Sequence, residues 1–324
     1  MLGSSADVPG LKQLIAERLA PMGVNVLVLE VDYSFQFQSH PEVSGGDLTK
    51  ADARGIAAVC REHGVRLIPL LNCLGHQSWK KDTGALLRAH PELEEIPEIS
   101  MDDPAFYCQS WCPLHPDVNP IIFDLMDELL DAFEADALHV GMDEVFIIGS
   151  GNCPRCKGKS TAELFAKAVS DYHGHLVGER GVEMLMWADR LLDAGATGYG
   201  MWEAAANGTA PAIDLVSKDI ILCDWHYEVL DRYPSLELFQ EKGFRVWPCP
   251  WRSPEAVQRL IAASKDGATE RMLGMCGTGW AAGGGGSDLA KVLAGEVKPD
   301  EETGMKDAIG TAEVLKAALE AFAD

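Results

Sequence analysis

Short apolar runs alternate with amphipathic segments along most of the chain. The apolar runs are rich in Val, Leu and Ile, as expected of strands buried on both faces, and they occupy residues 25–31, 66–71, 137–140, 183–187, 220–224, 244–247 and 272–275. Between them, apolar residues recur at helical spacing in segments 11–20, 48–63, 119–133, 161–180, 254–263 and 305–322. Strands that alternate with helices in this way indicate βαβ units and a parallel sheet.

The number of strands predicts a (β/α)8 barrel, a fold that fills roughly 250 residues or more as one unit. Seven strands follow from the pattern, so the eighth has to come from residues 1–3, or else the first strand is short, clipped or missing. No internal repeat or interdomain linker interrupts the chain. We therefore predict an α/β fold in which residues 1–324 form a single (β/α)8 TIM-barrel domain.

Two segments are expected to form loops at the mouth of the barrel. Residues 80–115 are long and irregular and contain several Pro, Trp and Cys. Loops longer than about 15 residues in compact domains are usually functional. Residues 281–287, Ala-Ala-Gly-Gly-Gly-Gly-Ser, follow the last strand and are of low complexity, which predicts a flexible loop.

Charge and composition exclude several classes of protein. With 27 basic and 50 acidic residues the net charge is −23, and such a surface repels phosphate backbones, so no nucleic-acid partner is expected. No apolar run reaches the ~18–20 residues needed to span a bilayer, and the N-terminus lacks the features of a signal peptide, so no membrane association is expected. Nine cysteines, an odd number, do not suggest a secreted disulfide framework. We expect a cytoplasmic protein that is a monomer or a homodimer.

Two adjacent carboxylates, Asp143 and Glu144, follow the apolar run that ends at Val140. In a parallel barrel, the carboxyl end of a strand delivers side chains into the mouth where chemistry takes place. Two acids held a few ångströms apart cannot both ionise easily, so one can keep a proton near neutral pH and protonate a departing oxygen. The alternative is that the pair only caps the next helix.

Aromatic residues gather at the ends of other predicted strands, where most of the eight tryptophans lie. Flat rings that carry an N–H group suit the C–H faces of a sugar ring. A single tryptophan is more often a core residue, but a cluster beside paired acids favours a carbohydrate site. Together with one histidine, the candidate binding residues are His76, Trp187, Trp202, Trp225, Tyr227 and Trp280.

Residues 138–145, Leu-His-Val-Gly-Met-Asp-Glu-Val, resemble the His-x-Gly-Gly-Asp-Glu motif of the family 20 glycoside hydrolases, the β-N-acetylhexosaminidases. Residues 74–76, Leu-Gly-His, are similar to that family's Pro-Gly-His, and the strand-end aromatics follow in the family's order. The resemblance extends from about residue 11 to Trp280. It is closest to the short, cytosolic hexosaminidase-D-like branch, through residues 23–30 and the Cys-Pro-Arg-Cys sequence at 153–156.

This resemblance implies a retaining exo-β-N-acetylhexosaminidase that removes terminal β-linked GlcNAc or GalNAc from a small molecule or glycan, with no catalytic cofactor. In this family the nucleophile is the substrate's own 2-acetamido oxygen. Glu144 would protonate the glycosidic oxygen and later deprotonate water, while Asp143 would orient the acetamido group. Tyr227 would hydrogen-bond the acetamido oxygen, three tryptophans would line the pocket, and His76 and His139 would hold the acids.

Three positions depart from the family pattern. The arginine that anchors ring hydroxyls from the family's first strand has no counterpart, the acid two positions after the last tryptophan is Ala282, and Met142 replaces a glycine. The first two departures concern ring hydroxyls and leave the choice between GlcNAc and GalNAc open. Candidates to replace the missing contacts are Asp32, Asp224 and Glu228.

Four cysteines suggest a metal site. Cys153 and Cys156 have the spacing of a zinc knuckle, and Cys108 and Cys112 lie in the long loop. Four thiolates from two loops on one face of the barrel would bind a structural Zn²⁺ tetrahedrally. A redox-active pair and ordinary buried thiols are the alternatives.

Two other functions are compatible with the sequence. A catalytically silent sugar-binding barrel would account for the missing arginine and acid, but the intact Asp143–Glu144 pair argues against it. A metal-dependent isomerase or aldolase would require His and acidic ligands on several strand ends and usually a Lys, and no Lys stands at a predicted strand end. The barrel itself does not decide, because it carries many chemistries.

Overall fold

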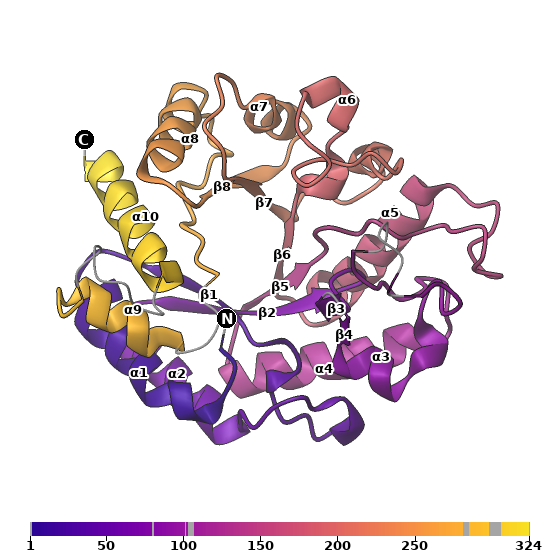
Figure 1. Ribbon diagram of the computed structural model, residues 1–324, viewed down its shortest axis with the longest axis horizontal. Coiled ribbons are helices and arrows are strands. Elements are labelled where there is room, and N and C mark those ends of the chain that lie inside the picture. Colours follow the sequence, from indigo (N-terminus) through magenta and orange to yellow (C-terminus); the bar gives the residue numbers. More distant parts are fainter. Residues whose placement is uncertain are drawn as a thin grey trace.

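One parallel sheet forms the centre of the molecule in a computed structural model that describes residues 2–79, 81–100, 102, 107–280, 285–297 and 306–323. Its strands pair in the order β1-β2-β5-β6-β7-β8, and helices surround them (Figure 1). The strands are β1 (Val26–Glu30), β2 (Arg66–Cys73), β5 (Ala137–Gly141), β6 (Glu183–Trp187), β7 (Ile221–His226) and β8 (Arg245–Pro250). All six correspond to apolar runs from which a strand was predicted.

The helices form an outer ring (Figure 1). Each long helix buries an apolar face, as Leu125 and Leu129 show in α4. Capping residues determine where some of the helices begin. Thr49 and Asp52 form a capping box at α2, and Ser160 caps α5. The helices are α1 (Val8–Leu14), α2 (Lys50–Glu62), α3 (Ala85–Ala89), α4 (Val118–Phe133), α5 (Thr161–His173), α6 (Ala194–Thr197), α7 (Pro234–Glu241), α8 (Pro254–Asp266), α9 (Gly285–Leu293) and α10 (Lys306–Ala323).

Short helical turns extend or connect these elements. Two are wide π-type turns that continue a helix, Ile15–Leu19 after α1 and Gly174–Glu179 after α5. The others are Ser5–Asp7, Asp32–Ser34, Pro41–Val43, Pro91–Leu93, Asp189–Leu191 and Ala210–Asp214. Among the described residues, no helix is both long enough and apolar enough to cross a bilayer.

The segment 80–115, predicted to be an extended loop, is more ordered than expected in the part that the structure describes. A small hairpin of β3 (Ser78–Trp79) and β4 (Asp82–Thr83) precedes α3. Residues 80, 101 and 103–106 lie outside the described residues. Further along, the backbone N–H of Trp111 donates to the carbonyl of Leu74 (3.1 Å), which attaches this segment to the end of β2.

The predicted strand at 272–275 forms only in part. Val246 of β8 exchanges backbone hydrogen bonds with the segment, accepting from Leu273 (2.9 Å). Further along, Pro248 and Pro250 accept bonds from residues 276 and 278, but a proline has no N–H to donate in return. The ladder is therefore one-sided, and the segment lies beside β8 without becoming a full strand.

The sheet is open between β1 and the segment 272–280. Leu2 donates one backbone hydrogen bond to Glu30 (2.8 Å) but does not form a strand, and Met1 lies outside the described residues. In the described part no strand precedes β1, in agreement with the alternative that the first strand of the barrel is short, clipped or missing. A cavity of about 570 Å³ lies on this open side, with Val26, Val28 and Trp247 among its lining residues. That residues 1–324 form one domain remains a prediction.

Candidate active site

Asp143 and Glu144 lie directly beyond β5, where the backbone turns sharply out of the strand. Gly141, Met142 and Glu144 all have positive φ, at 65°, 77° and 49°. The left-handed conformation costs a residue with a side chain about 1–2 kcal/mol, and such residues cluster at functional sites. At Gly141 a Cβ would lie 2.5 Å from Asn72 Oδ1, so glycine is required for β5 to approach β2.

The loop after β2 brings His76 to the acid pair. Its Nε2 lies 2.7 Å from Glu144 Oε2 and 3.4 Å from Asp143 Oδ2. Burial disfavours the charged imidazole, but the two carboxylates outweigh that effect and raise the pKa of His76 to about 10. The contact depends on Gly75, where a Cβ would lie 2.8 Å from the carbonyl oxygen of Asp143. Three residues predicted from two separate motifs thus form one cluster.

Asp143 has one carboxylate oxygen that no described residue satisfies. Burial raises the pKa of Asp143 to about 7, the carboxylates of Asp189 and Glu144 add to this, and His76 opposes it. Its Oδ1 is buried and has no hydrogen-bond partner among the described residues. A buried acceptor without a partner costs free energy. This oxygen is therefore placed to accept an N–H from a bound ligand.

Asp189 and Arg190, which follow β6, support the acid pair, although neither was predicted from the sequence to have a role. Asp189 Oδ2 accepts from the backbone N–H of Glu144 (3.0 Å) and from Arg190 Nε (2.6 Å). Arg190 is completely buried, and its Nη2 donates to carbonyl oxygens of Met201, Trp202 and Ala204. The available signal was an Asp-Arg pair close behind a predicted strand.

Three of the predicted aromatic residues form one group. The rings of Trp187 and Trp280 are 5.8 Å apart, and Trp280 Nε1 donates to the hydroxyl of Tyr227 (2.8 Å). Trp225 packs 4.8 Å from Tyr227, but it is only 8% exposed and its Nε1 donates to Asp189 Oδ1 (3.2 Å). Trp187 is buried to a similar extent, at 5% exposed, so exposure does not separate these two rings, and contact of Trp225 with a ligand stays a prediction.

Trp202 belongs to a second aromatic group. Its ring lies 4.8 Å from Tyr107 and 5.2 Å from Phe146, and it is 43% exposed. Tyr107 also lies 6.2 Å from His76, which connects this group to the acids. Burial and the carboxylate of Glu144 both raise the pKa of Tyr107. Tyr107 was not predicted from the sequence as a site residue, although it lies in the long loop where functional residues were expected.

His139 is a core histidine in this structure. Its Nδ1 accepts from the backbone N–H of Gly141 (3.0 Å), and its ring packs 4.5 Å from Trp187. Burial lowers its pKa to about 3, so the ring is neutral. Its Nε2 has no partner among the described residues. The expectation that His139 holds the acids directly is therefore wrong.

Two of the candidates for contacting ring hydroxyls are engaged elsewhere. Asp224 is buried and accepts from the hydroxyl of Ser235 (2.6 Å). Glu228 is well exposed and forms an ion pair with Arg252 (2.9 Å). Ala282, at the family's acid position, lies outside the described residues.

Asp32 is the candidate that remains near the acids. Its two oxygens accept from the backbone and side-chain amides of Asn72, at 2.7 and 3.0 Å. Asn72 also donates to Glu30 Oε1 (3.2 Å), and burial together with Asp32 raises the pKa of Glu30 to about 8. Both carboxylates interact electrostatically with His76, so they belong to the same polar cluster.

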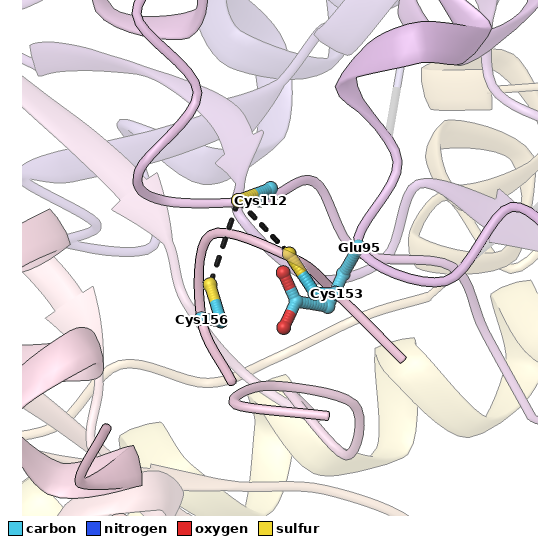
Figure 2. A group of neighbouring side chains, drawn as sticks. All are labelled: Glu95, Cys112, Cys153 and Cys156. Atoms are coloured by element: carbon cyan, nitrogen blue, oxygen red, sulfur yellow. Dashed lines mark hydrogen bonds between the residues drawn. The ribbon is translucent and has the colours of Figure 1, made fainter. Parts of the chain in front are cut away.

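The predicted four-cysteine site is wrong in one member. The thiols of Cys112, Cys153 and Cys156 come together, but the fourth donor is Glu95, and the four donor atoms lie within 4.8 Å of one another (Figure 2). The thiol of Cys108 instead donates to a backbone carbonyl of the acid-bearing turn (3.5 Å). Cys108 therefore lies outside the group of donor atoms.

A family model and two curated proteins match this chain. The model is that of the glycosyl hydrolase family 20 catalytic domain, and it matches residues 18–283. A beta-hexosaminidase of Vibrio furnissii is 26% identical over 201 residues, or 61% of this chain and 29% of the relative. A beta-hexosaminidase of Akkermansia muciniphila is 29% identical over 226 residues, or 66% of this chain and 43% of the relative. The chain spans less than half the length of these relatives.

A solved structure agrees with the fold. The chitobiase of Flavobacterium johnsoniae superposes with a TM-score of 0.62 at 19% identity, and the match covers 97% of this chain and 48% of that one. At this level of identity the similarity concerns the fold alone. It supports the predicted α/β (β/α)8 architecture.

Proposed function

Because the chain belongs to glycosyl hydrolase family 20, we propose that it is a retaining exo-β-N-acetylhexosaminidase acting on terminal β-linked GlcNAc or GalNAc. Both curated relatives are named beta-hexosaminidases, but the chain spans only part of their length, so the activity is a proposal. The hexosaminidase-D-like branch within the family remains a prediction.

One observation carries the proposal. Glu144 stands beside Asp143, whose buried Oδ1 has no partner among the described residues. The N–H of a 2-acetamido group would satisfy this oxygen and would leave the acetamido carbonyl free to attack C1. An unsubstituted hydroxyl at the same position offers no such nucleophile, so the arrangement favours N-acetylhexosamines over plain hexoses.

In the first step, the acetamido oxygen attacks C1 while the bond from C1 to the glycosidic oxygen breaks. Glu144 gives its proton to the departing oxygen, and a positively charged oxazolinium forms. Asp143 in its carboxylate form, which the charge on His76 favours, accepts the acetamido N–H and stabilises the positive charge. His76 binds Glu144 Oε2 (2.7 Å) and so fixes the direction of the acid.

In the second step, Glu144 takes a proton from water, and the oxygen of that water forms a bond to C1 from the face that the leaving group vacated. The bond between C1 and the acetamido oxygen breaks, so the acetamido group is restored and the configuration is retained. Trp187 and Trp280 would pack on the sugar and exclude other water, with Tyr227 held by Trp280 to contact the acetamido oxygen. Trp202, exposed beside Tyr107, would border the leaving group.

Replacement of the acid tests this scheme. Glu144→Gln should lose about 10²–10⁴-fold in kcat/KM on a disaccharide, whose leaving group needs a proton, and much less on an activated aryl glycoside. Glu163→Gln on the exposed start of α5 is the matched control. Equal losses on both substrates would argue against Glu144 as the acid.

A panel of aryl glycosides separates the competing functions. We expect turnover of the aryl β-GlcNAc or β-GalNAc substrate and none of the aryl β-glucoside, which lacks the acetamido group. Binding of N-acetylhexosamine without turnover would favour the silent sugar-binding barrel. Comparable turnover of the glucoside would remove the substrate-assisted scheme.

We also propose that the protein needs no catalytic cofactor, is cytoplasmic and is a monomer or a homodimer. The scheme needs no catalytic cofactor, so a Zn²⁺ near the cysteines would serve the fold. All nine cysteines are unpaired, which supports a reducing cytoplasm. Localisation of the tagged protein in its own cells and light scattering of the purified protein would test the compartment and the choice between monomer and homodimer.

A further inference from the structure

Three segments far apart in the sequence bring four buried side chains to one point (Figure 2). Glu95 follows the turn Pro91–Leu93, Cys112 precedes α4, and Cys153 and Cys156 lie in the loop between β5 and α5. None of the four is more than 2% exposed. In Figure 2 the thiols and the carboxylate point toward one another.

The carboxylate of Glu95 is the least expected member of this cluster. Its Oε1 accepts from the backbone N–H of Ser150 (3.1 Å), while Oε2 is buried and has no hydrogen-bond partner among the described residues. A half-satisfied carboxylate among thiols costs free energy, since sulfur is only a weak hydrogen-bond donor. A bound cation would remove that cost.

The spacing of the sulfurs suits a metal ion. Cys112 Sγ lies 3.5 Å from the sulfurs of both Cys153 and Cys156. Tetrahedral zinc with Zn–S bonds of about 2.3 Å places its ligand atoms about 3.8 Å apart. A disulfide would require about 2.05 Å. The cluster is thus close to the coordinated arrangement.

The loop that carries Cys153 and Cys156 has the features of a metal-binding knuckle. The backbone amides of Arg155 and Cys156 interact with the Cys153 sulfur, as expected where a short loop folds around its first cysteine. Three thiolates and one carboxylate around a divalent ion leave a charge of −2. In a chain of net charge −23, the exposed cations of this loop, Arg155, Lys157 and Lys159, are placed to offset it.

We propose that Glu95, Cys112, Cys153 and Cys156 bind one Zn²⁺ ion. Three thiolates and a carboxylate oxygen match the ligands and geometry that zinc prefers, and four protein ligands leave no open position, so the site is structural. The ion joins the segment before α4 to the loop after β5. Those two segments also carry Tyr107 and Glu144, so the metal fixes one side of the candidate active site.

Metal analysis of the purified full-length protein tests the proposal independently of any sugar chemistry. After reconstitution with Zn²⁺ under reducing conditions and removal of free ion, the wild type should retain one zinc per chain, and Cys153→Ser and Cys156→Ser should retain none. Cys108→Ala and Cys60→Ala, which remove buried thiols outside the donor set, should each retain one. No retained zinc in the wild type, or equal loss in Cys108→Ala, would overturn the assignment.

Cobalt substitution keeps the test valid if a cysteine variant fails to fold. Co²⁺ in the wild-type protein should give the intense visible bands of a tetrahedral site together with sulfur-to-cobalt charge transfer. Glu95→Gln should keep the charge transfer but lose Co²⁺ to a competing chelator at a lower chelator concentration. Octahedral cobalt spectra, or a Cys153–Cys156 disulfide that excludes metal even after reduction, would contradict the proposal.

Discussion

Five residues with side chains adopt a left-handed backbone at the ends of β1, β2 and β5: Asp32, Leu74, His76, Met142 and Glu144. Strain of this kind persists only where the surrounding structure holds it in place. Met142 shows how, because its side chain is 1% exposed and packs in the main hydrophobic core. At this position the related motif has glycine, which would adopt the backbone freely but bury nothing.

Replacement of Met142 weighs these two effects. Met142→Gly should relieve about 1–2 kcal/mol of backbone strain but lose about 2–5 kcal/mol of packing, so the free energy of unfolding should fall, by up to about 4 kcal/mol. Met142→Leu keeps the volume and should cost less than about 1.5 kcal/mol. Urea denaturation measures both. A more stable Met142→Gly protein would mean that the strain is the larger effect.

The pKa of Asp143 predicts the pH dependence of the proposed reaction. With a pKa of about 7, this acid is protonated at lower pH and no longer stabilises a positive intermediate, so kcat/KM should fall as the pH drops below about 7. The charge on His76 lowers that pKa, so His76→Gln should move the acidic limb to higher pH. A limb that stays in place in this variant would contradict the assignment.

The residues at the centre of the site could be predicted from the sequence better than the residues that hold them in place. Asp143, Glu144 and His76 were identifiable because each follows a strand within a motif. Arg190 was not, because its partners are backbone carbonyls, and a carbonyl is present at every residue. Glu95 was missed because the pattern of cysteines suggested a complete set of four thiols.

At the scale of elements, the site depends on how closely the loops after β2 and β5 approach each other. Gly75 lies at their contact, where a Cβ would meet the Asp143 carbonyl at 2.8 Å and Val145 Cγ2 at 2.9 Å. The backbone at Asp143 cannot move out of the way as the end of a flexible side chain could. The residues that carry His76 and the acids therefore form one unit, although they are almost 70 residues apart.

Gly75→Ala tests this contact. The added methyl group should displace the acid-bearing turn, and because a shift of about 1 Å can cost 10²-fold, kcat/KM should fall by about that factor. Gly178→Ala is the control, since nothing lies within 4 Å of its Cβ position and its φ is not positive. Its activity should be unchanged and its stability equal or slightly greater. Full activity in Gly75→Ala would show that the loops can separate freely.

The strands were predictable where apolar runs were continuous, and the prediction was less accurate where hydrogen bonding decided the outcome. The side chains of segment 272–275 are typical of a strand, but Pro248 and Pro250 of the neighbouring β8 have no N–H to donate to it. That effect depends on which residues face each other across the pair, and this register is not evident from a single strand. The segment 80–115 looked irregular because its hairpin strands are only two residues long.

At the scale of the whole molecule, buried acids make stability depend on pH. The folded-state pKa of Glu30 is raised from 4.5 to about 8, so the folded protein binds a proton that the unfolded chain releases. The stabilising effect is complete below about pH 4.5 and is lost as the pH rises toward 8. The free energy of unfolding should therefore decline across this range, by at most about 1.4 kcal/mol per pH unit for one group.

Glu30→Gln should flatten that decline, because the amide does not titrate. Urea denaturation at several pH values between 5 and 8 measures the slope for the wild type and the variant. Glu228→Gln, which removes an exposed carboxylate, is the control and should keep the wild-type slope. An unchanged slope in Glu30→Gln would show that this acid does not take up the proton.

The opening between β1 and the segment 272–280 has a consequence for the dynamics of the chain. The backbone of β5 or β6 has a neighbouring strand on each side, whereas β1 has a full neighbour only in β2. Deuterium from solvent should therefore replace the peptide hydrogens of β1 sooner than those of β5 and β6, even though all three strands belong to one sheet. Mass spectrometry of peptides from the labelled protein would reveal a gradient of protection, lowest in β1 and highest in β5 and β6.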